Sequence, residues 1–115
     1  MALYSGGYPS FLIYKNGGSP ATYSVSGPSM VIDNQWHLLT GVYDSSNVIL
    51  YLDGSSVNST PAPGVTMSST AYSFEIGGNT NGNTYHYFNG SIDDVRVYDR
   101  ALSATEVVNL YNMGK

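Results

Sequence analysis

The sequence has 115 residues, no cysteine, and a formal net charge of −4 from four basic and eight acidic residues. This length suits one small domain, and the lack of cysteine excludes disulfides and thiolate metal sites. So few cations disfavour a partner such as nucleic acid or an anionic membrane, and no apolar run approaches the length of a membrane span. Charged residues make up only 10% of the chain, whereas 11 residues are tyrosines, a balance common in secreted β-proteins.

Six short runs of β-type composition predict strands. In chain order they are residues 10–15, 21–25, 36–43, 48–52, 72–76 and 91–98. Turn signals separate the first strands, at Asn16-Gly17-Gly18, at residues 44–47 and at Asp53-Gly54. Residues 60–64 are predicted to be a loop because two prolines cannot serve a central strand. Residues 77–83, the longest small polar stretch, are predicted to be a surface loop.

The alternation within these runs indicates how the strands are buried. In residues 48–52 both alternating sets are apolar, whereas residues 36–43 place Trp36 and Val42 on one face and His37 and Tyr43 on the other. Strands that are buried on one face and aromatic on the other suit two packed sheets. The sequence therefore predicts an all-β sandwich.

One helix is predicted near the end of the chain. Ser103 and Glu106 have the spacing of a capping box, in which each side chain accepts a hydrogen bond from the other residue's backbone N–H. The apolar stripe that follows at helical spacing consists of Val107, Leu110 and Tyr111. Gly114 is expected to end the helix.

Two blocks of the sequence resemble laminin G-like jelly-roll domains, which share the concanavalin A-like lectin/glucanase sandwich. Residues 35–44 followed by 48–54 are similar to that family's W-H…Y-D…L-Y-x-D-G hairpin. Residues 88–103 are similar to its closing segment, in which Ala101-Leu102-Ser103 leads into a final helix. The resemblance implies a single domain over residues 1–115, a two-sheet antiparallel jelly-roll sandwich with one short C-terminal helix.

The family's first strands, which normally precede Leu3, are not found in this sequence. Unpaired strand edges and an uncovered apolar patch would then invite another chain. We therefore expect a homo-oligomer or a piece of a larger assembly. The alternative is a compact variant in which residues 3–25 refold to cover the gap.

The resemblance implies a non-enzymatic binding module that recognises glycans or an extracellular protein surface. The competing class is a structural or assembly module of an appendage, a virus particle or a larger surface protein, and fold analogy cannot choose between them. Either class implies an extracellular or cell-surface location, although Met1-Ala2-Leu3 does not begin a basic, apolar signal peptide.

Catalytic signals are weak in this sequence. The resemblance makes His37 a structural residue beside Trp36. Related sandwich glucanases keep paired acids at alternate positions of one strand, but Asp44 and Glu75 have no acidic residue two positions away. We therefore expect that the chain is not an enzyme.

Asp93 and Asp94 are the acidic pair from which a metal site could be built. Calcium prefers six to eight oxygen ligands, and it recurs in the resembled families. The predicted site uses both carboxylates with help from the Asn-rich loop. In the alternative, one aspartate bonds backbone N–H groups and the other pairs with Arg96.

Sugar binding is the site chemistry that the sequence favours most. Aromatic rings stack on pyranose faces, while amides and backbone groups bond the hydroxyls. The candidate ligand-binding residues are Tyr85, His86, Tyr87, Asn79, Asn81 and Asn83. Tyr14, Tyr43 and Tyr51 are further candidates on an outer sheet face. Alternatively, these tyrosines serve strand packing, which they also favour.

Overall fold

The computed structural model describes residues 2–3, 6–15, 22–67, 75–79 and 86–114. The described elements are β1 (Ala2–Leu3), β2 (Pro9–Tyr14), β3 (Thr22–Ser26), β4 (Leu39–Tyr43), β5 (Asn47–Leu52), β6 (Ser55–Pro61), β7 (Gly78–Asn79), β8 (His86–Tyr87) and α1 (Ala104–Met113). The strands pair antiparallel in the orders β1-β2-β3, β4-β5-β6 and β7-β8.

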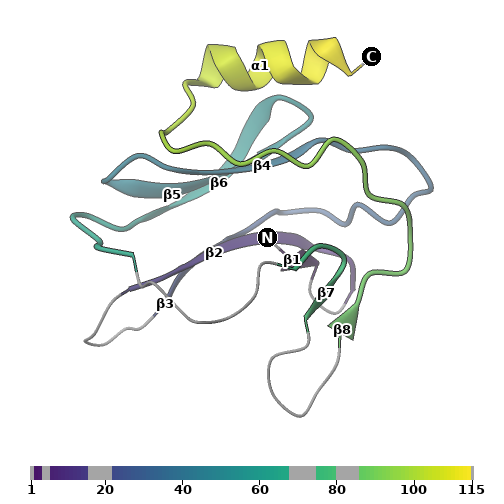
Figure 1. Cartoon of the computed structure of the whole chain (residues 1–115), viewed down its shortest axis with the longest axis horizontal. Helices are drawn as coiled ribbons and strands as arrows, with labels where there is room; N and C mark the ends of the chain where they lie inside the picture. The colour runs from purple at the N-terminus through teal and green to yellow at the C-terminus, as the bar shows by residue number, and fades with distance from the viewer. Residues whose placement is uncertain (1, 4–5, 16–21, 68–74, 80–85, 115) are drawn as a thin grey trace.

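The two three-stranded sheets pack face to face (Figure 1). The core between them consists of Ile13, Val25, Val48, Leu50, Ala62 and Val65. Two side chains of β6 also bind the backbone of β3. Asn58 Nδ2 donates to the carbonyl of Ser26 and Thr60 Oγ1 donates to that of Ser24, each at 2.8 Å. The predicted all-β sandwich is confirmed.

Helix α1 covers the other face of the β4-β5-β6 sheet (Figure 1). Val107 is fully buried there and packs with Leu102, Val42 and Tyr51. The sheet therefore lies between the β1-β2-β3 sheet and the helix. This position explains why both alternating sets of β5 are apolar. Within the described part of the chain, no helix is long and apolar enough to cross a membrane.

The predicted capping box at the start of α1 is confirmed. Ser103 Oγ accepts from the backbone N–H of Glu106 at 3.3 Å, and Glu106 Oε2 accepts from the N–H of Ser103 at 2.8 Å. The Arg100 guanidinium also donates to Glu106 Oε1 at 2.6 Å. Arg100 first, and then Ser103, lower the pKa of the Glu106 carboxyl to about 2. The Glu106 carboxylate thus secures both the helix start and the segment before it.

The predicted strand over residues 36–43 is only partly correct. β4 begins at Leu39, and Trp36 is exposed instead of belonging to a buried face. In the segment before β4, the backbone N–H groups of Gln35 and Leu38 donate to aspartate side chains, as described below.

The predicted strand over residues 91–98 is wrong. These residues are described, but they form no strand and all are exposed. Asp94 has a φ of 51°, a left-handed conformation that interrupts an extended backbone. Of the predicted strand over residues 72–76, only Glu75 and Ile76 are described, and neither lies in a strand.

β6 is a strand that the sequence pattern did not indicate. It overlaps the loop predicted at residues 60–64, because Pro61 still pairs opposite Asn47 as the last residue of an edge strand.

The turn predicted at Asp53-Gly54 is confirmed. Asp53 and Gly54 both have positive φ, at 52° and 81°, as the central residues of a type I′ hairpin require. The predicted turn at residues 16–18 lies outside the described residues.

Gly41 of β4 lets the two sheets approach closely. A Cβ atom added at this position would collide with the ring of Phe11, which comes from β2 on the opposite sheet. The Phe11 ring packs against the core of the sandwich. The close contact between Phe11 and β4 therefore depends on the absence of a side chain at Gly41.

We predict that Gly41→Ala lowers the free energy of unfolding by about 1–3 kcal/mol, because an added methyl group overpacks the sheet interface. Denaturant unfolding followed by circular dichroism measures this loss. Adding Phe11→Leu, which makes room for the methyl group, should recover part of it. Equal stability of Gly41→Ala and the parent chain would contradict the packing argument.

Candidate functional site

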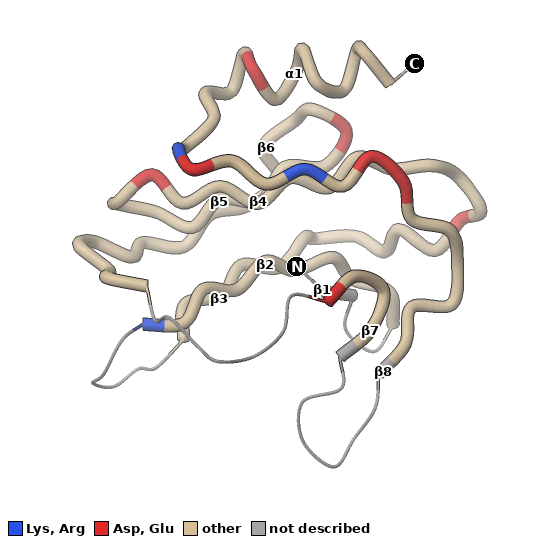
Figure 2. Tube along the Cα trace, in the orientation of Figure 1, with Lys and Arg blue, Asp and Glu red and all other residues tan. Residues whose placement is uncertain are grey.

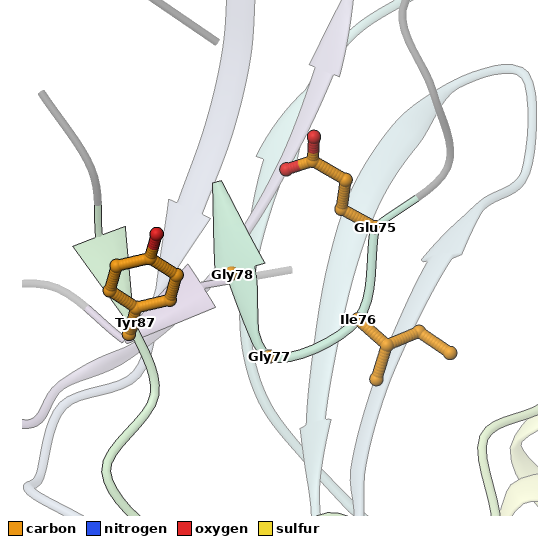
Figure 3. A pocket seen from close by; sticks show the side chains of 5 residues that line it. All are labelled: Glu75, Ile76, Gly77, Gly78 and Tyr87. Atoms are coloured by element: carbon orange, nitrogen blue, oxygen red, sulfur yellow. The ribbon is translucent and has the colours of Figure 1, made fainter. Parts of the chain in front are cut away.

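An open groove of about 300 Å³ lies beside the β7-β8 hairpin. It is lined by Glu75, Ile76, Gly77, Gly78 and Tyr87. In Figure 3 the backbone of the two glycines runs between the Tyr87 ring and the side chains of Glu75 and Ile76. The groove thus combines an aromatic ring, the backbone of two residues without side chains and one carboxylate.

The hairpin that carries the groove is held by backbone pairing. Gly78 lies opposite Tyr87 and Asn79 opposite His86. Beyond the last pair, the N–H of Phe88 donates to the carbonyl of Gly77 at 2.8 Å. Gly77 has a φ of 75°, which most side chains disfavour. These features fix the position of Tyr87 relative to residues 75–78.

Tyr87 is the predicted ligand-binding residue that the structure places in the groove. Its side chain is 71% exposed, so its ring is accessible to a ligand. Asn79 and His86 belong to the same hairpin through their backbones. The other three predicted residues, Asn81, Asn83 and Tyr85, lie outside the described residues. The sequence did not identify Glu75 and Ile76 as residues that line the groove. The adjacent Gly77 and Gly78 were the only nearby feature of the sequence that pointed to them.

The tyrosines that were predicted on an outer sheet face have different environments. Tyr51 is buried under α1, which excludes it from a surface site. The hydroxyl of Tyr43 accepts from the N–H of Val65 at 2.8 Å and lies 3.1 Å from that residue's carbonyl oxygen. Both therefore serve packing, as the alternative reading held. Tyr14 is 58% exposed, at the end of β2.

Asp93 and Asp94 lie on the exposed segment that leads to α1, where Figure 2 shows acidic and basic residues close together. Asp93 Oδ1 accepts from the N–H of Asp94 at 2.7 Å, and Asp94 Oδ1 lies 3.5 Å from Arg96 Nη2. Within the described ranges no third histidine or carboxylate joins them in a metal-type cluster. These contacts resemble the alternative expected for this pair, and calcium binding stays a prediction.

His37 binds two carboxylates, one through each ring nitrogen. Its Nδ1 lies 2.8 Å from Asp53 Oδ2 in the β5-β6 turn, and its Nε2 lies 3.1 Å from Asp33 Oδ1. The other oxygen of Asp53 accepts from the N–H of Leu38 at 2.9 Å. We call His37, Asp33 and Asp53 the imidazole clamp. It ties the residues before β4 to the β5-β6 turn, in agreement with a structural role for His37.

The clamp shifts the titration of its members. The hydrogen bond that the His37 ring donates to Asp53 raises the pKa of His37 despite partial burial, and Asp33 adds to this effect. The pKa of Asp33 is lowered, first by the N–H of Gln35 and then by His37. Because neutral imidazole has one N–H, only the protonated ring can donate to both carboxylates.

Together, the fold and the groove define a β-sandwich that carries an open surface site at one hairpin. The chain belongs to the concanavalin A-like lectin/glucanases superfamily, because the laminin G family model of that description matches residues 1–108. The family expected from the two sequence blocks is therefore confirmed.

A solved structure shares the fold. It is the crystal structure of residues 221–444 of an S-layer domain-containing protein from Clostridium thermocellum, with 23% sequence identity and a TM-score of 0.59. The match covers 89% of this chain and 51% of that one, so the chain spans about half the length of its neighbour. No curated protein matches the sequence significantly.

We predict that the stability of the chain falls as pH rises through the raised pKa of His37. The imidazolium contributes fully below its unfolded value of 6.5, and its contribution is lost above the folded value. The free energy of unfolding, measured between about pH 5 and pH 9, tests this over the range in which histidine titrates.

His37→Asn is the control for this measurement. It should be less stable at low pH and should lose most of the slope between pH 6 and pH 8. A parent chain that is equally stable throughout this range would contradict the clamp.

Proposed function

We propose that this chain is a non-catalytic surface module that binds a carbohydrate in the groove beside β7-β8. The observation that carries this proposal is the exposed Tyr87 ring, held by strand pairing beside the backbone of Gly77 and Gly78. A pyranose can stack its apolar face on the ring while its hydroxyls bond the bare backbone and the carboxylate of Glu75.

Several observations support this function. The residues of the hairpin carry few charges, which suits a neutral ligand better than an ionic one. The superfamily to which the chain belongs is named for lectins as well as glucanases. Glu75 is the sole carboxylate lining the described groove, and glycoside hydrolysis generally requires two facing carboxylates. An extracellular or cell-surface location follows from this proposal.

A second candidate function is assembly with other surface proteins. It is favoured by a run of exposed apolar side chains on the segment before α1. These are Ile92, Val95, Val97 and Tyr98. The solved neighbour is named for an S-layer domain, which also favours a surface structure. In this function the expected homo-oligomer or larger assembly would form over that segment.

We predict that Tyr87→Ala weakens carbohydrate binding by about fivefold or more, because it removes the stacking surface worth on the order of 1 kcal/mol. A glycan array identifies the bound sugar, and titration calorimetry measures both affinities. Tyr14→Ala is the matched control, since Tyr14 is a similarly exposed tyrosine on β2. It should leave the affinity unchanged.

Two results would reject the carbohydrate proposal. One is equal affinity of the Tyr87→Ala and Tyr14→Ala variants, which would move the site away from the groove. The other is an array without binding at millimolar sugar together with stable oligomers in light scattering. The second result would select the assembly function.

Calcium is proposed to stabilise the segment that contains Asp93 and Asp94. We expect added calcium to raise the melting temperature of the parent chain, because an ion that binds only the folded state stabilises it. The Asp93→Asn, Asp94→Asn double variant should lose this increase. Identical melting curves in calcium and in chelator would eliminate the metal site.

A further inference from the structure

Trp36 is the single tryptophan of the chain, and its side chain is 70% exposed. It lies before β4, outside the described core clusters. Two other large apolar side chains of the same segment, Met30 and Ile32, are also exposed. A tryptophan usually buries most of its large surface, so this degree of exposure is uncommon.

The backbone on both sides of Trp36 is fixed. On the preceding side, the N–H of Gln35 donates to Asp33 Oδ1 at 2.9 Å. On the following side, the ring of His37 is held by both carboxylates of the imidazole clamp. The N–H of Leu38 then donates to Asp53 Oδ1. The indole is therefore presented to solvent from an ordered backbone, which lowers the entropy cost of binding a ligand there.

We propose that Trp36 is a second carbohydrate-contact site, in which the exposed indole stacks on the face of a pyranose and the imidazole clamp holds it in position. The neighbouring exposed side chains are Asn34 and Gln35, whose amides can bond sugar hydroxyls. This inference rests on the proposed function for its ligand class, but it uses different residues and a different segment from the groove.

The clamp makes this site sensitive to pH. The groups that face His37 are the carboxylates of Asp33 and Asp53. Helix α1 packs on the adjoining turn, where Tyr111 and Val108 approach Gly54. Its carboxylate, Glu106, is bonded to Arg100 and Ser103 instead. Loss of the imidazole proton therefore releases one of the two clamp carboxylates and loosens the backbone beside Trp36.

Because Trp36 is the sole tryptophan, its fluorescence reports this site directly. We would titrate the chain with the methyl glycosides of glucose, mannose, galactose and N-acetylglucosamine. The expected result is a saturable change in emission and reduced quenching by acrylamide. By calorimetry, Trp36→Ala should lower the affinity for the same sugar about tenfold, whereas Trp36→Phe, which keeps an aromatic face, should retain most of it.

The second measurement separates a positioning role of the clamp from a general effect on folding. For the parent chain, the affinity measured through Trp36 should fall several-fold between pH 6 and pH 8. Asp33→Asn should remove most of this dependence, because the amide can donate to a neutral imidazole nitrogen and keep the contact. Both chains must remain folded at both pH values, which circular dichroism establishes.

Tyr87→Ala distinguishes this proposal from the groove. It should weaken binding at the groove but leave the response of Trp36 intact. If the array shows binding while Trp36 emission stays constant and Trp36→Ala binds normally, the Trp36 site is rejected and the groove stands. An indole that acrylamide cannot reach in the free chain would also reject it, because another chain or segment would then cover Trp36.

Discussion

The burial of β5 on both of its faces is the constraint on which the rest of the structure depends. Val48 and Leu50 pack against the β1-β2-β3 sheet, while Tyr51 packs under α1 with Val107. At roughly 25 cal/mol per Å² of apolar surface, burying such side chains is the main favourable contribution to folding. The β1-β2-β3 sheet packs on one of these two faces, and α1 packs on the other. The candidate sites are consequently found where neither face reaches, at the β7-β8 hairpin and before β4.

Local chemistry explains which parts of the fold the sequence could predict. Residues 48–52 carry apolar side chains at every position, and Ser103 with Glu106 satisfies the first helical N–H groups within four residues. Asp53-Gly54 likewise specifies its own turn through positive φ. Each of these signals is complete within a short segment. Such features could be predicted from neighbouring residues alone, and the structure confirms them.

The errors arise where the outcome depends on distant residues. Residues 91–98 have the composition of a strand, but composition does not show whether another strand lies beside them to pair with. In the structure they form no strand, and Asp94 adopts a left-handed backbone conformation. β6 is rich in serine and lacks apolar alternation, yet β5 gives it a partner and β3 accepts its side-chain hydrogen bonds. The groove shows the same division. Tyr87 could be predicted from its type, whereas Glu75 and Ile76 join it only through the pairing of Gly78 with Tyr87.

The imidazole clamp shows how one motif can serve structure and function together. His37 beside Trp36 and the Asp-Gly of the β5-β6 turn belong to the hairpin on which the family resemblance rests, and the resemblance implied a structural role for this histidine. In space, the same histidine fixes the backbone on one side of an exposed indole by means of Asp33 and Asp53. Charge-assisted hydrogen bonds of this kind are stronger than neutral ones, so they can hold a loop that has little buried apolar surface of its own. Few residues of this chain are charged, yet the three titratable side chains of the imidazole clamp lie together around the loop before β4. The position of Trp36 therefore depends on the protonation of His37.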